Sequence, residues 1–426
     1  MRKKVVALLV ILVLITVSLW AQGQKPADAA KKTDVVRVGI LLPLSGAQAI
    51  DGANMRNGYE LGAYIVNNSI DIDLTMARTE GIPSLGGAKI ELVFADDQGI
   101  PEKGMSETER LITGGSVAVI SGAYSSAVTA TAQMVAERYQ FPFVNALSSS
   151  PMLNKMGLEW FFRTTPDDTI FMRTIYDFLE DLKTRDGATW KRIAILHEDS
   201  LWGTDCGNLL ADFAKLYGYN LVSKISFPTG TVDLTSEVTR TKSANPEILV
   251  QFAYAQDQVL LVNTMKLLDF NVDMLIGGIQ YPAIFEALGK DADGMYFREV
   301  FNEDIALTNK SAEKVVELWQ KLYGGGFGNA PRAVDAILVI ADAINRAGST
   351  DPTAIRNALR ETDLSGDEIF LPWEGVKFDE HGMNIKSSGI IVQYQGAGKD
   401  QGLHQVWPFE SSVKDPQYPM VPWKQR

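Results

Sequence analysis

Hydroxyl-bearing side chains follow two short apolar stretches of the sequence. The segment "GAYSSAVTA" (122–130) follows "VAVI", and "ALSSSP" (146–151) follows "FPFV". If both apolar stretches are parallel strands, the two loops meet at the carboxyl edge of one sheet, where open α/β sheets bind ligands. Ser125 and Ser126 also begin a helix, whose dipole favours a carboxylate by about 0.3–1 kcal/mol. Serine is also a good helix cap and turn former, but two such loops together favour a ligand cradle.

Two aromatic residues occupy equivalent places in the second half of the chain. Trp202 in "HEDSLWG" and Tyr254 in "QFAYAQD" each follow an expected strand. They would lie at the carboxyl edge of a second sheet and face the first sheet across a cleft. Packing at the rim of a sheet is an equally good explanation for each residue alone.

Groups typical of catalysis or metal binding are sparse. The histidines His197, His381 and His404 are far apart and lack metal-ligand spacing. The sequence contains no G-x-S-x-G motif and no phosphate-binding loop, and "GGGFG" follows a helix, where it would end that helix. Asp96 and Asp97 are adjacent on a strand end, so they point to opposite faces and fit a turn. We therefore expect no catalytic residue, metal site or cofactor.

Strands and helices alternate along most of the chain. This pattern covers two runs, 35–165 and 168–298, and is typical of βαβ units with mainly parallel sheets. Three helices are then expected at 310–323, 331–347 and 352–361, and a late strand at 389–395. The fold class is therefore α/β.

Length and composition set the broad class of protein. A chain of 426 residues with 46% hydrophobic and 22% charged residues is globular and long enough for two domains. The net charge of −12 argues against nucleic acid or an anionic membrane surface as a partner. The single cysteine, Cys206, cannot form an intramolecular disulfide and is expected to be a small buried hydrophobe.

The N-terminus has the pattern of an export signal. Positive residues in "MRKK" precede a 16-residue apolar stretch, which is short of the ~20 residues that a spanning helix needs. We expect residues 1–21 to be a cleaved signal peptide and residues 22–33 a flexible leader, so that the protein is exported. An uncleaved anchor is the alternative interpretation.

An ordered series of segments resembles a known family. The segments are "VGILLPLSGAQAIDGANMRNGYELG", "KIELVFADDQGIPEKG", "FFRTTPDD", "AILHEDSLWGTD", "VDLTSEVTRTKSANPEILV" and "ADAINRAGSTDPTAIRNALRETD". Together they resemble the extracytoplasmic solute-binding proteins of ABC importers, in the leucine/isoleucine/valine-binding branch of type I periplasmic binding proteins. The resemblance covers almost the whole mature chain.

The resemblance implies two Rossmann-like lobes joined by a three-segment hinge. Crossings would fall near Pro166–Asp168, near Arg298 and within 373–385. The expected lobe boundaries follow from these crossings: an N-lobe of residues 34–167 and 299–375, and a C-lobe of residues 168–298 and 376–426.

The resemblance also assigns site residues. The two hydroxyl loops would hold a ligand carboxylate, Asp168 would help hold an amine, and Trp202 and Tyr254 would cover the ligand. The loop positions involved are Ala123, Ser125 and Ser126 in the first loop, and Leu147, Ser148 and Ser149 in the second.

Two positions depart from the family pattern. A family aromatic falls on Asp51, and a family acid that binds the amine falls on Ile279 or Gln280. Amine recognition would then run through Asp168 with Asp51, or would be absent. The solute could be an amino acid, an amide, or an aromatic or small carboxylate.

The resulting functional hypothesis is a monomeric binding protein. It would capture a small carboxylate-bearing solute, such as a branched-chain amino acid, between its lobes and deliver it to an ABC permease. A ligand sensor that docks on a membrane receptor or kinase is the alternative, and the sequence does not separate the two. An enzyme would need a nucleophile–base pair or a dinucleotide loop, and a DNA-binding repressor would need a basic helix–turn–helix.

Overall fold

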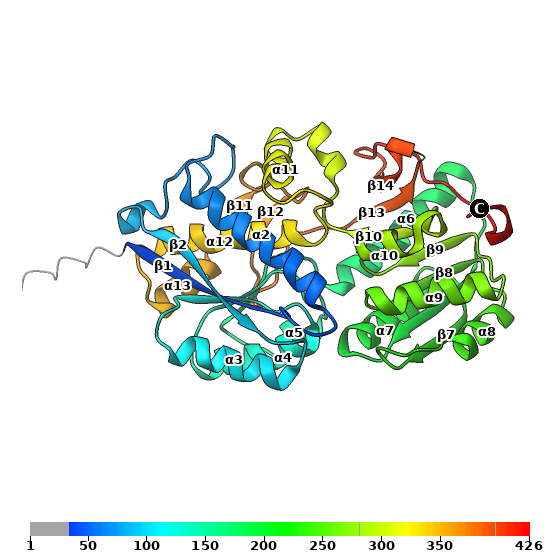
Figure 1. The fold of residues 1–426 in the computed structure, drawn as a ribbon, viewed down its shortest axis with the longest axis horizontal. Helices are drawn as coiled ribbons and strands as arrows, with labels where there is room; N and C mark the ends of the chain where they lie inside the picture. Colours follow the sequence, from blue (N-terminus) through cyan, green and yellow to red (C-terminus); the bar gives the residue numbers. More distant parts are fainter. Residues whose placement is uncertain (1–33, 281, 397) are drawn as a thin grey trace, which may run out of the picture.

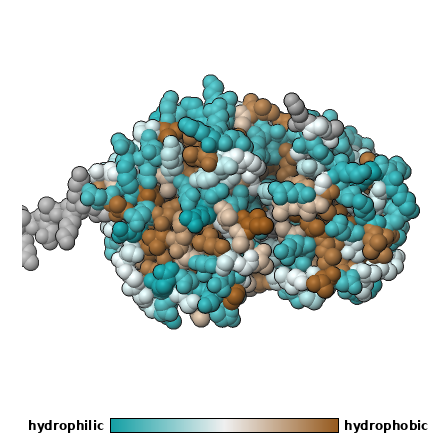
Figure 2. Space-filling model, viewed as in Figure 1, coloured by the Kyte–Doolittle hydropathy of each residue, from teal (hydrophilic) through white to brown (hydrophobic). Residues whose placement is uncertain are grey.

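The computed structural model describes residues 34–426 except 281 and 397, so the expected signal peptide (1–21) and leader (22–33) lie outside the described residues. Two α/β lobes lie side by side (Figure 1), each with its own sheet. This confirms the predicted fold class. On the face drawn in Figure 2, polar residues cover most of both lobes, with apolar residues in smaller groups between them.

The first sheet contains five parallel strands in the order β2-β1-β3-β4-β5. They are β1 (Val35–Leu42), β2 (Lys89–Asp96), β3 (Val119–Gly122), β4 (Phe143–Asn145) and β5 (Phe161–Arg163). Helices α2 and α12 lie on one side of this sheet, and α3 and α4 on the other (Figure 1). Their bounds are α2 (Ala49–Asn67), α3 (Pro101–Thr113), α4 (Ser126–Arg138) and α12 (Ala330–Ala347), and the short α5 (Met152–Lys155), α13 (Pro352–Arg360) and the 3-10 turn η1 (Pro83–Leu85) complete this half.

Helices α2 and α12 come from opposite ends of the chain and pack closely. A Cβ added at Gly58 would lie 2.4 Å from the Ala330 carbonyl oxygen, and one at Gly62 would lie 2.8 Å from Ile337 Cβ. The glycines therefore allow a close approach that larger residues would prevent. This contact returns the late helices of the chain to the first sheet.

The second sheet has the order β14-β13-β10-β9-β8-β6-β7. Its strands are β6 (Arg192–Glu198), β7 (Asn220–Phe227), β8 (Ile248–Phe252), β9 (Met274–Gly277), β10 (Tyr296–Glu299), β13 (Ile390–Gln395) and β14 (Gly402–Trp407). The pairs from β7 to β10 are parallel, whereas β13 and β14 are antiparallel additions at one edge. The helices of this half are α6 (Asp168–Asp186), α7 (Leu201–Leu216), α8 (Thr235–Ser243), α9 (Ala255–Leu267) and α10 (Pro282–Leu288), followed by the turn η2 (Gly289–Ala292).

The chain passes between the two halves three times. It leaves β5 for α6, leaves β10 for η3 (Glu303–Leu307) and α11 (Lys310–Leu322), and leaves β12 (Gly375–Lys377) for β13. A small antiparallel pair of β11 (Asp363–Ser365) with β12 precedes the last passage. Three short 3-10 turns complete the described chain: η4 (Gly366–Glu368), η5 (Gly398–Asp400) and η6 (Trp423–Gln425).

Several details differ from the sequence-based expectations. Helix α2 begins at Ala49 rather than at residue 52, which places Asp51 in its first turn. Strand β14 and the β11–β12 pair were not expected, because they are short and lie in segments rich in glycine, proline and charge. The antiparallel edge makes the second sheet mainly, rather than wholly, parallel.

Candidate functional site

The two hydroxyl loops lie side by side at the carboxyl edge of the first sheet, as predicted. Strands β3 and β4 are parallel neighbours. Ser125 caps α4, since its hydroxyl accepts a hydrogen bond from Val128 N at 3.2 Å. Ser126 Oγ lies 3.4 Å from Ser150 N and accepts its hydrogen bond, which joins the first loop to the second. The helix-cap explanation and the cradle explanation for these serines are therefore compatible.

Ser148 of the second loop also hydrogen-bonds to the first loop and to α4. Its hydroxyl lies 2.6 Å from Thr129 Oγ1 and 3.0 Å from the Ala123 carbonyl oxygen. Asn145 at the end of β4 holds the same turn, because its amide oxygen accepts from Leu147 N and Ser148 N at 3.0 Å. These contacts fix the backbone of the second loop before any ligand arrives.

Arg163, the last residue of β5, also holds the second loop in place. Its guanidinium donates to the carbonyl oxygens of Ser149 at 3.1 Å and Ser150 at 2.6 Å. The side chain is fully buried, and burial lowers the pKa of Arg163 to about 10, although Asp167 and Asp168 raise it. Sequence reasoning did not select Arg163 or Asn145. A charged residue inside the apolar run "FFR" was the available signal for Arg163.

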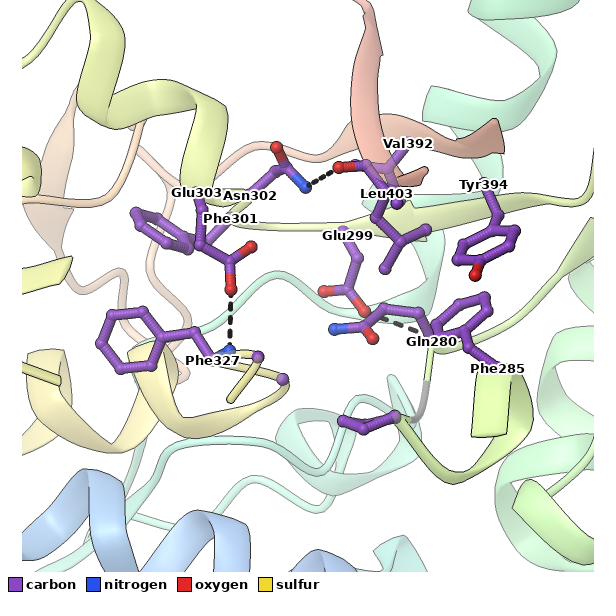
Figure 3. Close-up of a pocket in the computed structure, with 14 residues that line it drawn as sticks. Gln280, Phe285, Glu299, Phe301, Asn302, Glu303, Phe327, Val392, Tyr394 and Leu403 are labelled. Carbon is purple, nitrogen blue, oxygen red and sulfur yellow. Dashed lines mark hydrogen bonds between the residues drawn. The ribbon is translucent and has the colours of Figure 1, made fainter. Parts of the chain in front are cut away.

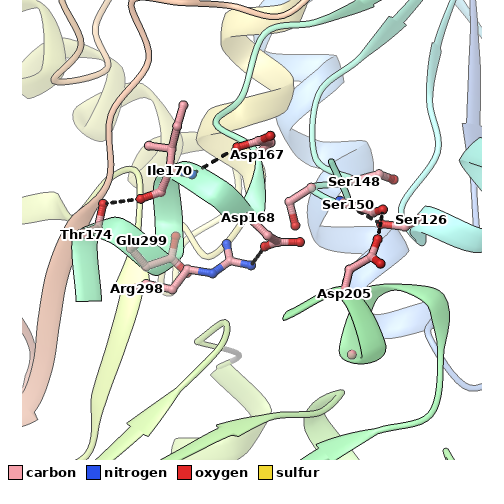
Figure 4. Close-up of polar contacts among 12 residues, drawn as sticks. Ser126, Ser148, Ser150, Asp167, Asp168, Ile170, Thr174, Asp205, Arg298 and Glu299 are labelled. Carbon is pink, nitrogen blue, oxygen red and sulfur yellow. Dashed lines mark hydrogen bonds and ion pairs between the residues drawn. The ribbon is translucent and has the colours of Figure 1, made fainter. Parts of the chain in front are cut away.

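The second sheet contributes an aromatic wall that meets the first loop. Trp202 lies in the first turn of α7, and Tyr254 precedes α9. The rings of Trp202 and Tyr254 are 5.3 Å apart, and the Tyr254 ring is 6.2 Å from Tyr124 of the first loop. Ser150 also hydrogen-bonds to Asp205 of α7 (Figure 4). The two lobes are therefore in direct contact through these groups.

A small cavity remains where the loops and the aromatic wall meet. We call it the serine cavity; its volume is about 10 Å³, and it is lined by Tyr124, Ser126, Leu147, Ser148, Ser149, Trp202, Tyr254 and Ile279. This volume is on the order of that needed for one water molecule. Trp202 is only 3% exposed, and its Nε1 has no hydrogen-bond partner within the described part of the chain. A buried donor in this state is available to a ligand.

The two predicted acids lie next to this cavity but do not line it. Asp168 is fully buried and pairs with Arg298 at 3.2 Å (Figure 4). Burial raises the pKa of Asp168, and Arg298 lowers it. Burial also raises the pKa of Asp51 to about 7, against the hydrogen bond from Tyr124. Ala123 and Ser125 likewise belong to the first loop without lining the cavity.

A larger cavity of about 300 Å³ lies at the passage from β10 to η3, and we call it the hinge cavity (Figure 3). Gln280 lines it, whereas the preceding Ile279 lines the serine cavity, so the two cavities are neighbours. Its other walls come from five distant segments: α10 (Pro282, Phe285), β10 and η3 (Glu299, Phe301, Asn302, Glu303), the turn before α12 (Gly326, Phe327, Gly328), β13 (Val392, Tyr394) and β14 (Gly402, Leu403).

A buried ion pair contributes to the wall of the hinge cavity through Glu299. Arg332 of α12 donates to Glu299 at 2.7 Å, and both side chains are 1% exposed. Burial lowers the pKa of Arg332, the carboxylate of Glu299 raises it, and the nearby cation of Arg298 lowers it. Arg332 also donates to Asn329 Oδ1 at 2.6 Å, so its guanidinium is held at both ends. Sequence reasoning missed both members of this pair.

Comparisons with known proteins agree on one family. The family model described as "Periplasmic binding protein" matches residues 35–399. Leu/Ile/Val-binding protein homolog 7 of Brucella suis is 26% identical over 422 residues, which cover 96% of this chain and 99% of that protein.

Solved structures share the fold. The leucine-binding protein LivK of Thermotoga maritima aligns with a TM-score of 0.73 at 21% identity, covering 87% of this chain and 97% of that one. A solute-binding protein of an ABC transporter from Rhodopseudomonas palustris, in complex with 3,4-dihydroxybenzoic acid, aligns with a TM-score of 0.69 at 20% identity, covering 87% and 95%. Within residues 34–426, apart from the two left out, no helix is long and apolar enough to cross a membrane.

Proposed function

Because the chain belongs to the periplasmic binding protein family, we propose that it is an exported protein that captures a small carboxylate-bearing solute and delivers it to an ABC permease. Residues 34–167 and 299–375 would form one lobe and residues 168–298 and 376–426 the other. The protein would act as a monomer. It would perform no chemistry on the solute.

The observation that carries this proposal is the meeting of two differently built lobes around the serine cavity. The first lobe contributes hydrogen-bonded loops with a helix N-terminus, and the second contributes Trp202 and Tyr254. Such an arrangement suits a solute that binds first to the polar loops and is then covered when the lobes close. In the structure, the rings of Tyr124, Trp202 and Tyr254 line this cavity.

We assign the solute carboxylate to the serine loops. Backbone N–H groups at the start of α4 and the hydroxyls of Ser126 and Ser149 would donate to it, as charge-assisted hydrogen bonds. Ala123, Ser125, Leu147 and Ser148 would keep the loops in position. The rest of the solute would extend past Ile279 and Gln280 into the hinge cavity.

Intrinsic fluorescence of the mature protein tests this function. The protein is first unfolded and refolded to remove any bound solute, and is then titrated with amino acids, amides, aromatic carboxylates and diacids while the unfolding temperature is followed. A solute that binds only the folded state raises that temperature. We expect one class to give a saturable tryptophan signal together with this rise.

Matched variants locate the signal. Trp202→Phe should remove most of the fluorescence change, whereas Trp423→Phe, in the C-terminal turn, should keep it. Ser126→Ala should weaken binding about tenfold or more, since a charge-assisted hydrogen bond is lost, and Ser106→Ala on the exposed side of α3 should not. Absence of any saturable response across the panel would contradict the proposed function.

A further inference from the structure

We infer that Glu198 and Gln258 are positioning residues for solute capture, because they join the three loops of the second lobe that follow β6, β8 and β9. Trp202, Tyr254 and Ile279 lie in or directly after these loops, and all three line the serine cavity. Glu198 and Gln258 do not line it, so each would act through the loops that it holds. This inference rests on the proposed function and adds two residues to the same site.

Glu198, the last residue of β6, connects the loops after β6 and β8. These two strands are parallel neighbours. One carboxylate oxygen of Glu198 accepts from Ser200 Oγ at 2.6 Å, and the other accepts from Tyr254 N at 3.2 Å. Ser200 in turn caps α7, since its hydroxyl accepts from Gly203 N at 3.1 Å. A single side chain therefore sets the start of α7, which carries Trp202, and the start of α9.

The surroundings of Glu198 leave it little freedom. A Cβ added at Gly203 would lie 2.3 Å from the Glu198 carbonyl oxygen and 2.7 Å from its Cγ, so α7 begins directly against this residue. Glu198 is fully buried, and burial raises its pKa to about 7, whereas the hydrogen bonds from Ser200 and Tyr254 lower it. A buried carboxylate is costly unless its oxygens are paired. Both oxygens of Glu198 are paired only while the two loops keep their present separation.

Gln258 of α9 connects the loops after β8 and β9, which are also parallel neighbours. Its side-chain amide donates to the carbonyl oxygens of Ala253 at 2.9 Å and Ile279 at 3.0 Å. Gln251 of β8 donates to the amide oxygen of Gln258 at 2.5 Å, and both glutamines are fully buried. Ile279 lines the serine cavity and the next residue, Gln280, lines the hinge cavity. Gln258 therefore positions a loop that contributes to both cavities.

The two links share the loop after β8, because Ala253 and Tyr254 are adjacent. Together they form a continuous connection from the end of β6 to the loop after β9. Loops that are held in place before binding lose less conformational freedom when a solute is covered. The second lobe would thus present its aromatic wall and Ile279 as one unit. In the first lobe, the serine loops achieve the same result through bonds to one another.

Hydrogen exchange of the refolded mature protein without solute tests the connection. In Glu198→Ala, the amides of 200–204 and 253–257 should exchange about tenfold or more faster, because local opening becomes easier where the shared hydrogen bonds are lost. In Gln258→Met, which keeps a side chain of similar length but lacks the amide, the faster segments should be 253–257 and 277–280. Exchange is followed by mass spectrometry.

Two further variants separate positioning from a general loss of stability. Glu198→Gln retains an acceptor for Tyr254 N and can donate to Ser200 Oγ, so it should restore most of the protection that Glu198→Ala loses. Val238→Ala, buried in α8 of the same lobe, lowers stability away from these loops and should not raise their exchange selectively. Faster exchange throughout the lobe in Glu198→Ala, or no change at 200–204 and 253–257, would overturn the inference.

Calorimetry with leucine and benzoate as probes connects the loops to binding. For a probe that binds, Glu198→Ala and Gln258→Met should each weaken affinity about tenfold, whereas Glu198→Gln and Val238→Ala should stay within about threefold. Unchanged affinity in both Glu198→Ala and Gln258→Met would overturn the inference while the proposed function stands. If neither probe binds, the exchange result alone decides the inference. The proposed function fails only if the wider fluorescence panel is also silent.

Discussion

The serine cavity and the hinge cavity are neighbours built on different principles. The serine cavity, about 10 Å³, is enclosed by loops whose hydroxyl and backbone groups bond to one another, and by rings from the facing lobe. The hinge cavity, about 300 Å³, is walled by rings and carboxylates from widely separated segments. The first is preorganised for one functional group, and the second leaves room for variation in the solute. In the proposed function, the group common to the solutes and the group that varies would occupy separate cavities.

The largest effect is expected at the buried ion pair beside the hinge cavity. Arg332→Leu leaves Glu299 buried without a counter-charge, which typically costs about 3–5 kcal/mol. Denaturant unfolding should show this loss. Arg56→Leu, which removes an exposed i,i+4 pair with Glu60, should cost about 0.5 kcal/mol or less. Equal losses in the two variants would mean that the Arg332–Glu299 pair is open to solvent.

A second test compares the packing of the two cavities directly. Trp202→Ala removes a ring packed against Phe252 and Tyr254, and should reduce the free energy of unfolding by about 3 kcal/mol. Leu403→Ala enlarges a space that already exists in the hinge cavity, so it should cost less than about 1 kcal/mol. A larger loss for Leu403→Ala than for Trp202→Ala would contradict the packing of Trp202 against Phe252 and Tyr254.

The smallest expected effect is a pH dependence beside the serine cavity. The pKa of Asp51 is raised from 3.8 to about 7, so the folded protein binds its proton more tightly than the unfolded chain does. The associated stability is present below pH 4 and is lost as the pH rises to 7. Asp51→Asn should therefore match the wild type near pH 4 and be more stable above pH 7. We expect a gain of only about 1 kcal/mol, because opening of the lobes would relieve part of the burial of Asp51.

Unfolding temperatures measured from pH 4 to pH 8 provide this comparison. Glu198 and Asp335 also have pKa values raised by burial to about 7, but they are present in both proteins and cancel in the difference. A constant difference between wild type and variant across the pH range would contradict the raised pKa of Asp51 in the folded protein.

The sequence allowed prediction of those features that depend on neighbouring residues. The alternation of strands and helices, the two hydroxyl loops at adjacent strand ends, and the helix cap at Ser125 all follow from local patterns. The place of Trp202 and Tyr254 at the carboxyl edge of the second sheet was predictable for the same reason, since each lies at the start of the helix that follows a strand.

The hinge cavity could not be predicted in this way. Phe285, Phe327 and Leu403 lie far apart in the chain, and they meet only because the chain passes three times between the lobes. The buried cations Arg163 and Arg332 were missed because local patterns treat arginine as a surface residue. Their partners, two backbone carbonyls and Glu299, can be identified only once the fold is known.

Hydrogen exchange with and without bound solute tests the central claim, that the two cavities are parts of one solute site. The solute used is the best binder from the fluorescence panel, and exchange is followed by mass spectrometry. We expect protection to rise together in the serine loops (122–128 and 147–150) and in the hinge-cavity segments (279–285 and 299–303). Protection of the serine loops alone, or of neither region, would contradict the claim.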